Sequence, residues 1–180
     1  MRGHVGTGGQ RPFTACILAT STRTSAVMAS VGMGRTFGST SAAARRRLPA
    51  RAAVGYLTVD GPRTNVFHLP VRGTGDGGMY STVADIHALW AALFAGRIVP
   101  EHRVSEMIRP QSSVPSESMR YGLGFWLHES DDAVVLEGYD AGVSFRTVHD
   151  PVEGYTHTVI SNWSDGAWPI ARHLDDLLAP

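Results

Sequence analysis

The chain has 180 residues, and all 16 of its basic residues are arginine, so the sequence contains no lysine. This composition excludes mechanisms that need a lysine amine, namely a Walker P-loop, a Schiff base or a Ser-x-x-Lys nucleophile pair. Sixteen Asp and Glu balance the arginines, which gives zero net charge and an isoelectric point near 7.1. A neutral chain offers no electrostatic reason to expect binding to nucleic acid or to an anionic membrane. With 43% apolar residues, the chain is expected to form one folded domain.

The zero net charge conceals a difference between the two ends of the chain. Residues 1–59 carry eight arginines and no acid, whereas residues 60–180 carry eight arginines and all sixteen acids. Residues 1–47 are mostly Gly, Ala, Ser, Thr and Arg. We predict that 1–47 is a low-complexity, basic, disordered leader, because it has little apolar surface to offset the entropy lost on ordering. A targeting segment and an arm that contacts acidic groups are the alternative interpretations.

The sequence says little about the compartment. The single Cys16 cannot form an internal disulfide and is interpreted as an incidental thiol. The apolar stretch 13–19 is shorter than a secretory signal normally needs. No run approaches the roughly 18 apolar residues of a transmembrane helix, so no membrane segment is expected. The cytoplasm is therefore the default location.

From about residue 48 the patterns are those of a folded domain that continues to residue 180. Residues 53–59 form a strand-like run that ends in a turn at 60–62. The glycine-rich stretch 72–78 is not expected to bind phosphate, because no Lys-Ser/Thr follows it.

The clearest helix signal begins at Thr82, an N-cap residue that Asp85 follows at the spacing of a capping box. Apolar residues then recur at intervals of three and four up to Gly96, which predicts one buried stripe. The stripe consists of Val83, Ile86, Leu89, Trp90, Leu93 and Phe94. His87 is interpreted as a surface residue. A second, short helix is predicted over 101–108.

The remaining residues alternate as in a sheet. We predict strands over 121–127, 133–136, 143–148 and 155–161, and a surface loop over 111–119. A final helix begins near Pro169, and it should pack on the sheet. Its apolar face consists of Ile170, Leu174, Leu177 and Leu178. The element order predicts an α+β fold in which helices pack on an antiparallel sheet.

Several stretches resemble the C-terminal part of serine β-lactamase-like hydrolases, a family of class C β-lactamases, D-alanyl-D-alanine carboxypeptidases and related esterases. The stretches are Gly32-Met33 with Thr36-Phe37, Ala53-Val54-Gly55-Tyr56, Gly77-Gly78-Met79-Tyr80-Ser81-Thr82 with Asp85, Tyr121-Gly122-Leu123-Gly124-Phe125, Gly138-Tyr139-Asp140-Ala141-Gly142-Val143-Ser144-Phe145, and Val159-Ile160-Ser161-Asn162. The resemblance implies a β-lactamase/transpeptidase-like fold over 48–180, a small-molecule or peptide substrate, and no cofactor.

The resemblance also implies a mechanism, in which the intact enzyme hydrolyses an amide or ester through an acyl-serine. That serine lies in a Ser-x-x-Lys motif, which a Tyr-x-Asn or Ser-x-Asn motif assists. Neither motif occurs here, because no serine has a lysine three residues on and neither Tyr56 nor Tyr80 begins Tyr-x-Asn. We therefore expect the chain to be catalytically inactive alone.

A third family motif, Lys-Thr-Gly or His-x-Gly, can be placed in the sequence. Matching Ala141-Gly142-Val143 and Pro151 to the family's strand, turn and strand puts Leu136-Glu137-Gly138 at that motif, with only the glycine kept. The resemblance implies that the N–H of Tyr139 forms half of an oxyanion hole. It assigns the groove wall to Leu136, Glu137, Gly138, Tyr139, Asp140 and Gly142, beside the loop 111–119. A glycine kink without function is the alternative interpretation of Gly138.

Other groups of residues give weaker indications of a functional site. His149 and His157 flank a predicted hairpin turn, but no close His-x-His or His-x-x-x-His spacing supports a metal site, and none is predicted. Trp126, Trp163 and Trp168 are interpreted as packing residues.

Two alternatives to the C-terminal portion of a serine hydrolase remain open. One is a non-catalytic binding module that keeps the groove, and the other is a truncated gene product without a function of its own. The sequence does not distinguish β-lactam, peptide and ester substrates, and the oligomeric state is likewise undetermined.

Overall fold

The computed structural model describes residues 15–17, 52–57, 63–68 and 79–178. In chain order the elements are β1 (Ala15–Ile17), β2 (Tyr56–Leu57), β3 (Arg63–Thr64), β4 (Met79–Ser81), α2 (Val83–Phe94), α3 (Glu101–Met107), β5 (Ser112–Val114), the 3-10 turn η1 (Pro115–Glu117), β6 (Met119–Tyr121), β7 (Trp126–His128), β8 (Val134–Asp140), β9 (Val143–Asp150), β10 (Tyr155–Ser161) and α4 (Trp168–Leu178). Of the leader 1–47 the description includes only β1, whose backbone pairs with β4. The rest of the leader, the turn at 60–62 and the glycine-rich stretch 72–78 lie outside the described residues.

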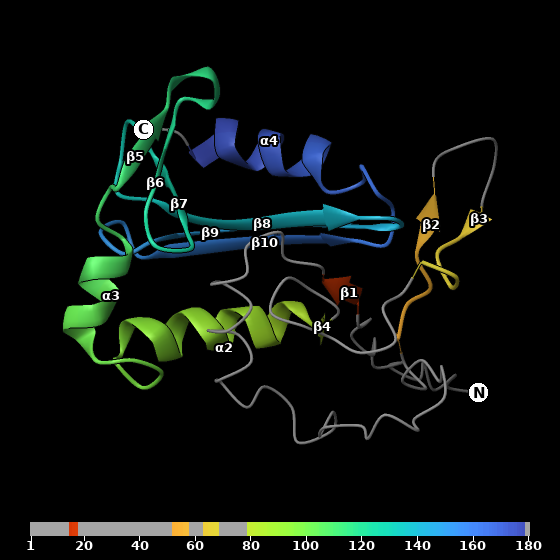
Figure 1. Ribbon diagram of the computed structural model, residues 1–180, viewed down its shortest axis with the longest axis horizontal. Helices are drawn as coiled ribbons and strands as arrows, with labels where there is room; N and C mark the ends of the chain where they lie inside the picture. Colours follow the sequence, from red (N-terminus) through yellow and green to blue (C-terminus); the bar gives the residue numbers. More distant parts are fainter. Residues whose placement is uncertain (1–14, 18–51, 58–62, 69–78, 179–180) are drawn as a thin grey trace, which may run out of the picture.

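A six-stranded antiparallel sheet lies at the centre, with the strand order β10-β9-β8-β7-β6-β5. Every neighbouring pair in it is antiparallel, and the turn Ala141-Gly142 joins the two long central strands β8 and β9. Helix α2 lies along one face of the sheet and α4 along the other (Figure 1). The expected α+β class, with helices packed on an antiparallel sheet, is confirmed.

Helix α2 forms as its sequence predicts. The Thr82 side chain accepts a hydrogen bond from the Asp85 N–H at 3.2 Å, and the Asp85 carboxylate accepts one from the Thr82 N–H at 3.0 Å. Such a box satisfies two backbone donors at the helix start and contributes about 1 kcal/mol. The buried residues of α2 are Ile86, Leu89, Trp90 and Leu93. They form one core with residues that include Phe125, just before β7, and Phe145 of β9, and each such buried side chain contributes about 1.5–3 kcal/mol.

A polar bond fixes α2 to the sheet within this core. The indole Nε1 of Trp90 donates to the Thr147 hydroxyl at 2.9 Å, and that hydroxyl donates in turn to the His157 carbonyl at 3.0 Å. The buried indole N–H is therefore satisfied, as a buried donor must be if it is not to cost stability.

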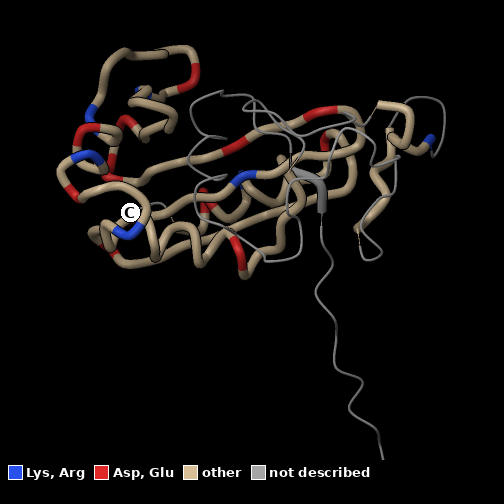
Figure 2. Tube along the Cα trace, turned by 60° about the horizontal axis from the view of Figure 1, so that its bottom comes forward, with Lys and Arg blue, Asp and Glu red and all other residues tan. Residues whose placement is uncertain are grey.

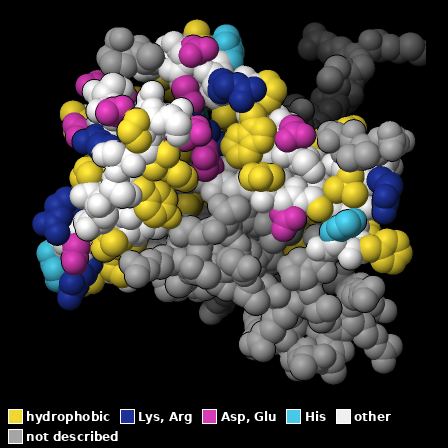
Figure 3. Space-filling view, turned by 45° about the horizontal axis from the view of Figure 1, so that its top comes forward, with side chains coloured by type: hydrophobic (Ala, Val, Ile, Leu, Met, Phe, Trp, Pro, Cys, Tyr) yellow, Lys and Arg dark blue, Asp and Glu magenta, His cyan; other side chains and the backbone are white. Residues whose placement is uncertain are grey.

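Helix α4 lies over the sheet as expected, but of its predicted apolar face only Leu174 is half-buried. Ile170, Leu177 and Leu178 are exposed, and the buried residue of the helix is Ala171. Figure 3 shows apolar side chains at the surface on this side of the molecule. Asp175 of α4 makes ion pairs with Arg146 and His157 of the sheet, and these charged contacts link the helix to the sheet.

Three further boundaries differ from the sequence predictions. Part of the expected loop 111–119 is the strand β5, which pairs with β6. The expected single strand 121–127 is divided between β6 and β7, because Gly124 has a φ of +98° and turns the chain. The expected strand 133–136 continues to Asp140 as β8. Within the described residues, no helix is long and apolar enough to cross a membrane.

Candidate functional site

The second half of β8 has an open edge. Strand β7 pairs with β8 only through Trp126 opposite Val135 and Leu127 opposite Val134. From Leu136 to Asp140 the β7 side of β8 has no strand partner among the described residues, although β9 pairs with the other side throughout. The residues that the sequence placed in the groove wall therefore lie at this edge and in the turn that follows it.

The backbone of Tyr139 points towards this open edge. The His128 N–H donates to the Ala133 carbonyl at 3.1 Å, so these two residues form a hydrogen-bonded pair between β7 and β8. In an antiparallel ladder such pairs alternate, which directs the backbone groups of Val135 towards β7. The register of β8 is continuous, so the N–H and C=O of Glu137 and Tyr139 point to the same side as those of Val135.

The β8–β9 turn gives the same direction for the backbone groups of Tyr139. Asp140 and Val143 flank the two-residue connection Ala141-Gly142 and form the last pair of the ladder. Residues that flank such a connection bond to each other, so Asp140 and Gly138 direct their backbone groups towards β9. The Tyr139 amide, placed between them, is directed away from β9.

The side chains of this segment point alternately to the two faces of the sheet. Leu136 is only 3% exposed and packs in the core with α2, so its side chain lies in the core and not at the surface of the groove. Tyr139 is 60% exposed, and its ring packs edge to face on that of Trp168 of α4, with the ring centroids 6.2 Å apart. Gly138 is buried and Asp140 is exposed.

Buried hydrogen bonds hold the turn after β8. The Asn65 side chain accepts from the Gly55 N–H at 3.1 Å and donates to the Ala141 carbonyl at 3.0 Å. From the other side, the Ser164 hydroxyl accepts from the Gly142 N–H at 2.9 Å. Gly55 has no room for a side chain, since a Cβ there would overlap Asn65 and the Gly142 carbonyl. The turn is thus fixed between two segments that are distant in sequence.

Sequence reasoning missed Asn65. It follows Thr64 in a stretch with turn-like composition, and no local pattern distinguishes a buried asparagine from an exposed one.

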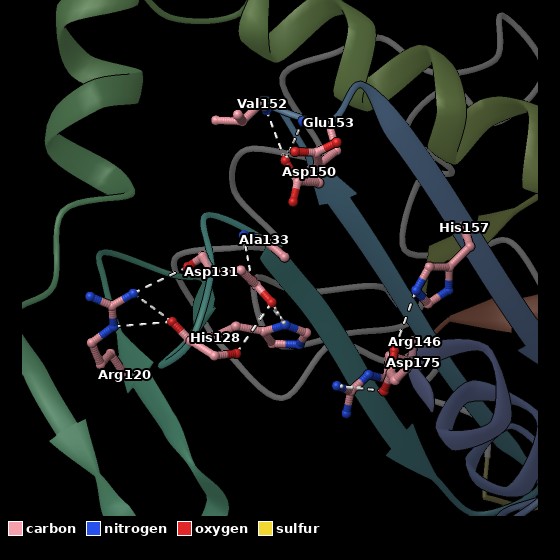
Figure 4. A network of polar contacts seen from close by, with 11 residues as sticks. Arg120, His128, Asp131, Ala133, Arg146, Asp150, Val152, Glu153, His157 and Asp175 are labelled. Atoms are coloured by element: carbon pink, nitrogen blue, oxygen red, sulfur yellow. Dashed lines mark hydrogen bonds and ion pairs between the residues drawn. The ribbon is translucent and has the colours of Figure 1, made fainter. Parts of the chain in front are cut away.

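Behind the open edge, an ionic cluster joins three strands and one helix. Arg146 of β9 contacts Glu137 of β8 at 3.1 Å and Asp175 of α4 at 3.0 Å. Asp175 also contacts the His157 ring at 3.3 Å, which links α4 to β10 (Figure 4). Burial raises the pKa of the Glu137 carboxyl above its ordinary value, and the Arg146 charge opposes that shift. Arg146 follows Phe145 in the predicted strand 143–148 and is the one charged residue there, which was the signal in the sequence that it has a partner.

His149 and His157 do not face each other. His149 stacks on Trp90 of α2 at 5.4 Å and bonds to the Thr156 hydroxyl at 2.7 Å, whereas His157 contacts Asp175 of α4. The two rings therefore lie on opposite faces of the sheet. Burial lowers the pKa of His149. In the part of the chain that the structure describes, no three His, Cys, Asp or Glu side chains are grouped so as to hold a metal ion.

A cavity of about 330 Å³ lies at the other end of β8 and β9, away from the Ala141-Gly142 turn. Its lining residues are Asp131, Asp132, Asp150, Val152, Glu153, Tyr155 and Leu178. The Asp150 carboxylate in it accepts from the N–H groups of Val152 and Glu153, both at 2.8 Å. Its carboxylate therefore has a structural role in the β9–β10 loop (Figure 4).

Comparison with known proteins finds similarity in structure. No protein-family model and no curated protein matches the sequence. A penicillin-binding protein from Bacillus halodurans matches with a TM-score of 0.72 and 29% identity, over 84% of this chain and 47% of that one. An octameric penicillin-binding protein homologue from Pyrococcus abyssi matches with a TM-score of 0.63 and 20% identity, over 84% of this chain and 35% of that one.

A D-amino acid amidase from Ochrobactrum anthropi, complexed with D-phenylalanine, matches with a TM-score of 0.55 and 22% identity, over 83% of this chain and 51% of that one. This chain therefore spans about half, or less, of the length of each solved structure. Together with the sheet and helices described above, the matches show that the chain has the penicillin-binding-protein and β-lactamase-like fold of serine hydrolases.

Proposed function

We propose that this chain supplies one wall of the substrate groove of a serine hydrolase that cleaves an amide or ester through an acyl-serine. The observation that carries the proposal is the open edge of β8, where the backbone of Tyr139 is directed away from β9 and has no strand partner among the described residues. The similarity to penicillin-binding proteins supports it, because those proteins share this sheet.

In this proposal the Tyr139 N–H donates to the oxygen that becomes negative when the acyl carbon is attacked. A backbone donor that is already fixed in place needs no reorganisation during the reaction, and removal of one such donor costs about 10²–10³ in kcat. The hydrogen bonds from Asn65 and to Ser164 fix the turn two residues further on. The resemblance noted in the sequence assigns the second donor to the N–H of the nucleophilic serine.

The nucleophile belongs to residues other than these 180. The chain has no lysine and therefore no Ser-x-x-Lys, the motif in which the related enzymes activate their serine. Leu136, at the position assigned to the Lys or His of the third motif, is buried and carries no group that could transfer a proton. We accordingly propose that the chain alone does not form an acyl-enzyme.

Covalent labelling tests the proposed inactivity. The purified chain is incubated with a fluorescent penicillin and with a fluorophosphonate, beside an active penicillin-binding protein as the positive control. We expect no labelled band from the chain. A labelled band that disappears when a single serine is replaced by alanine would show that the chain carries its own nucleophile.

The upstream nucleotide sequence and a binding measurement together distinguish the C-terminal portion of a hydrolase from a non-catalytic binding module. Reading the nucleotides upstream of Met1 in all three frames shows whether an in-phase Ser-x-x-Lys and Tyr-x-Asn precede the chain. If both are present, the interpretation as the C-terminal portion of a hydrolase is supported. If both are absent and the chain still binds a D-Ala-D-Ala peptide saturably without acylation, the binding-module interpretation takes its place.

A further inference from the structure

The groove wall proposed above carries an excess of negative charge. The described residues include seven arginines and fourteen acids, and acids recur along the tube in Figure 2. At the wall itself, Glu137 lies on β8 and the exposed Asp140 ends the strand. The negative groups that act on the Glu137 carboxyl include Asp175 of α4 and Glu117 of η1.

The arginine at this wall is already engaged. Both terminal nitrogens of Arg146 contact carboxylates, one from Glu137 and one from Asp175, and its side chain is only 18% exposed. To pair with a ligand carboxylate, Arg146 would have to leave one of these partners, and a second carboxylate would then lie unpaired beside the ligand. Like charges placed in this way repel, most strongly where water is partly excluded.

The strand also lacks a cation at the first position of the third motif, where the resemblance places Lys or His in the related enzymes. Leu136 occupies that position and its side chain lies in the core, 3% exposed. The exposed surface at the end of β8 is aromatic instead, since Tyr139 is 60% exposed and packs against Trp168. A ligand along this edge therefore meets backbone N–H and C=O groups, aromatic rings and carboxylates.

We infer that the β8 wall selects an amide or ester substrate that is uncharged or cationic next to the scissile bond, and that it discriminates against one with a free carboxylate there. The inference rests on the proposed function, because it assumes that substrate lies along the β8 edge. Glu137 is the specificity-determining residue in this assignment, acting by its charge and by occupying Arg146.

Two probes that differ in this charge and in one methyl group test the inference. N-acetyl-D-alanyl-D-alanine and its methyl ester are titrated into the ¹⁵N-labelled 180-residue chain at pH 8 and low ionic strength, and the amide signals of Gly138, Tyr139 and Asp140 are followed. We expect the ester to shift these signals with a Kd at least about tenfold lower than that of the acid. In about 0.5 M NaCl the ratio of the acid's Kd to the ester's Kd should fall, because salt screens the repulsion between the acid's carboxylate and the wall's carboxylates.

Two variants test whether the charge of Glu137 causes the preference for the ester. Glu137→Gln keeps the shape of the side chain and removes its charge, so the acid should bind more tightly and the ratio should fall by about threefold or more. Asp176→Asn removes the same charge from an exposed position of α4, outside the cluster, and should leave the ratio unchanged. Dispersed amide spectra of both variants establish that they are folded.

Each outcome has a definite meaning. If both probes shift the Gly138 to Asp140 signals and the acid binds as tightly as the ester, the charge selectivity is wrong while the proposed groove stands. If neither probe shifts them, the proposed groove is wrong and the selectivity falls with it. If the ester is preferred but Glu137→Gln leaves the ratio unchanged, Glu137 does not determine specificity and the inference is overturned.

Discussion

The Asn65 side-chain amide donates a hydrogen bond to the Ala141 carbonyl at 3.0 Å, across 76 positions of sequence. The same side chain accepts from the Gly55 N–H at 3.1 Å, so both ends of one buried amide are satisfied. Asn65 is only 2% exposed, and the turn that it holds follows directly on the proposed groove wall. Because the amide bridges Gly55 and Ala141, its loss affects the turn and the backbone at Gly55 together.

We expect Asn65→Asp to destabilise the chain by about 1–3 kcal/mol, because the buried Ala141 carbonyl loses its donor and faces a carboxylate instead. Urea unfolding measures the loss. Hydrogen exchange at Gly142 and Tyr139 should accelerate by more than at β9 residues such as Val148. Gln111→Glu, an amide-to-acid change at an exposed position, is the control and should cost little. Equal stabilities of the two variants would show that Asn65 does not hold the turn.

Gly142 and Gly154 provide a matched comparison of backbone strain and space. Their φ angles are +76° and +74°, but a Cβ on Gly142 would lie 2.8 Å from the Asn65 Cβ, whereas a Cβ on Gly154 has nothing within 4 Å. Gly154→Ala should therefore cost about 1–2 kcal/mol from the left-handed conformation alone. Gly142→Ala should cost about 1–3 kcal/mol more, because it also overpacks the turn. The difference in unfolding free energy is the measurement, and similar costs would contradict the crowding.

The pH dependence of stability should report the burial of Glu137. Burial raises its folded-state pKa above the ordinary value of 4.5, with the Arg146 charge opposing the shift. A raised folded pKa means that the associated stabilisation is fully present below the unfolded pKa and is lost as the pH rises through the folded pKa. The stability of the natural chain minus that of Glu137→Gln should therefore fall as the pH rises from below 4.5 through the folded pKa. Denaturant unfolding at a series of pH values checks this, and a difference that grows with pH would contradict it.

The bond between Trp90 and Thr147 should contribute to the packing of α2 on the sheet. A double-mutant cycle with Trp90→Phe and Thr147→Val separates this bond from the volume that each substitution removes. We expect a coupling energy of about 0.5–1.5 kcal/mol, the usual range for a buried hydrogen bond between neutral groups. Trp90→Phe paired with Leu177→Ala, at an exposed position of α4 on the other face of the sheet, serves as the reference cycle, in which the two costs should add. Additivity in the Thr147 cycle as well would show that the bond contributes nothing.

Elements specified by local patterns could be predicted from the sequence. Helix α2 is the clearest case, because the Thr82 and Asp85 box and the apolar stripe lie within one short segment. The predicted strand at 133–136 ended too early, because Gly138 and Asp140 have none of the side-chain character of a buried strand and are held there by pairing with β9. The turn at Gly124 divides the stretch 121–127, because the positive φ there breaks the single strand that the local pattern predicted.

The polar contacts of the site could be predicted only in part. The resemblance assigned Leu136 to Gly142 to one wall, but it did not indicate that the Leu136 side chain lies in the core. Helix α4 shows the same limitation, because its apolar residues suggested a hydrophobic contact where Asp175 binds Arg146 and His157. Such contacts depend on which side chains three distant segments bring to one place, and no short stretch of sequence contains that information.

The open edge of β8 presents peptide groups, and every residue except proline carries the same N–H and C=O. Replacement of Tyr139 by most other residues would therefore leave the outward-pointing donor unchanged, provided that the turn beyond it keeps its shape. Under the proposed function, substitutions at 136, 137 and 139 would change the side chains that a ligand meets without removing the donor itself. A search for related groove walls should accordingly look for a strand with an open edge that ends in a fixed two-residue turn. A sequence motif would not identify them.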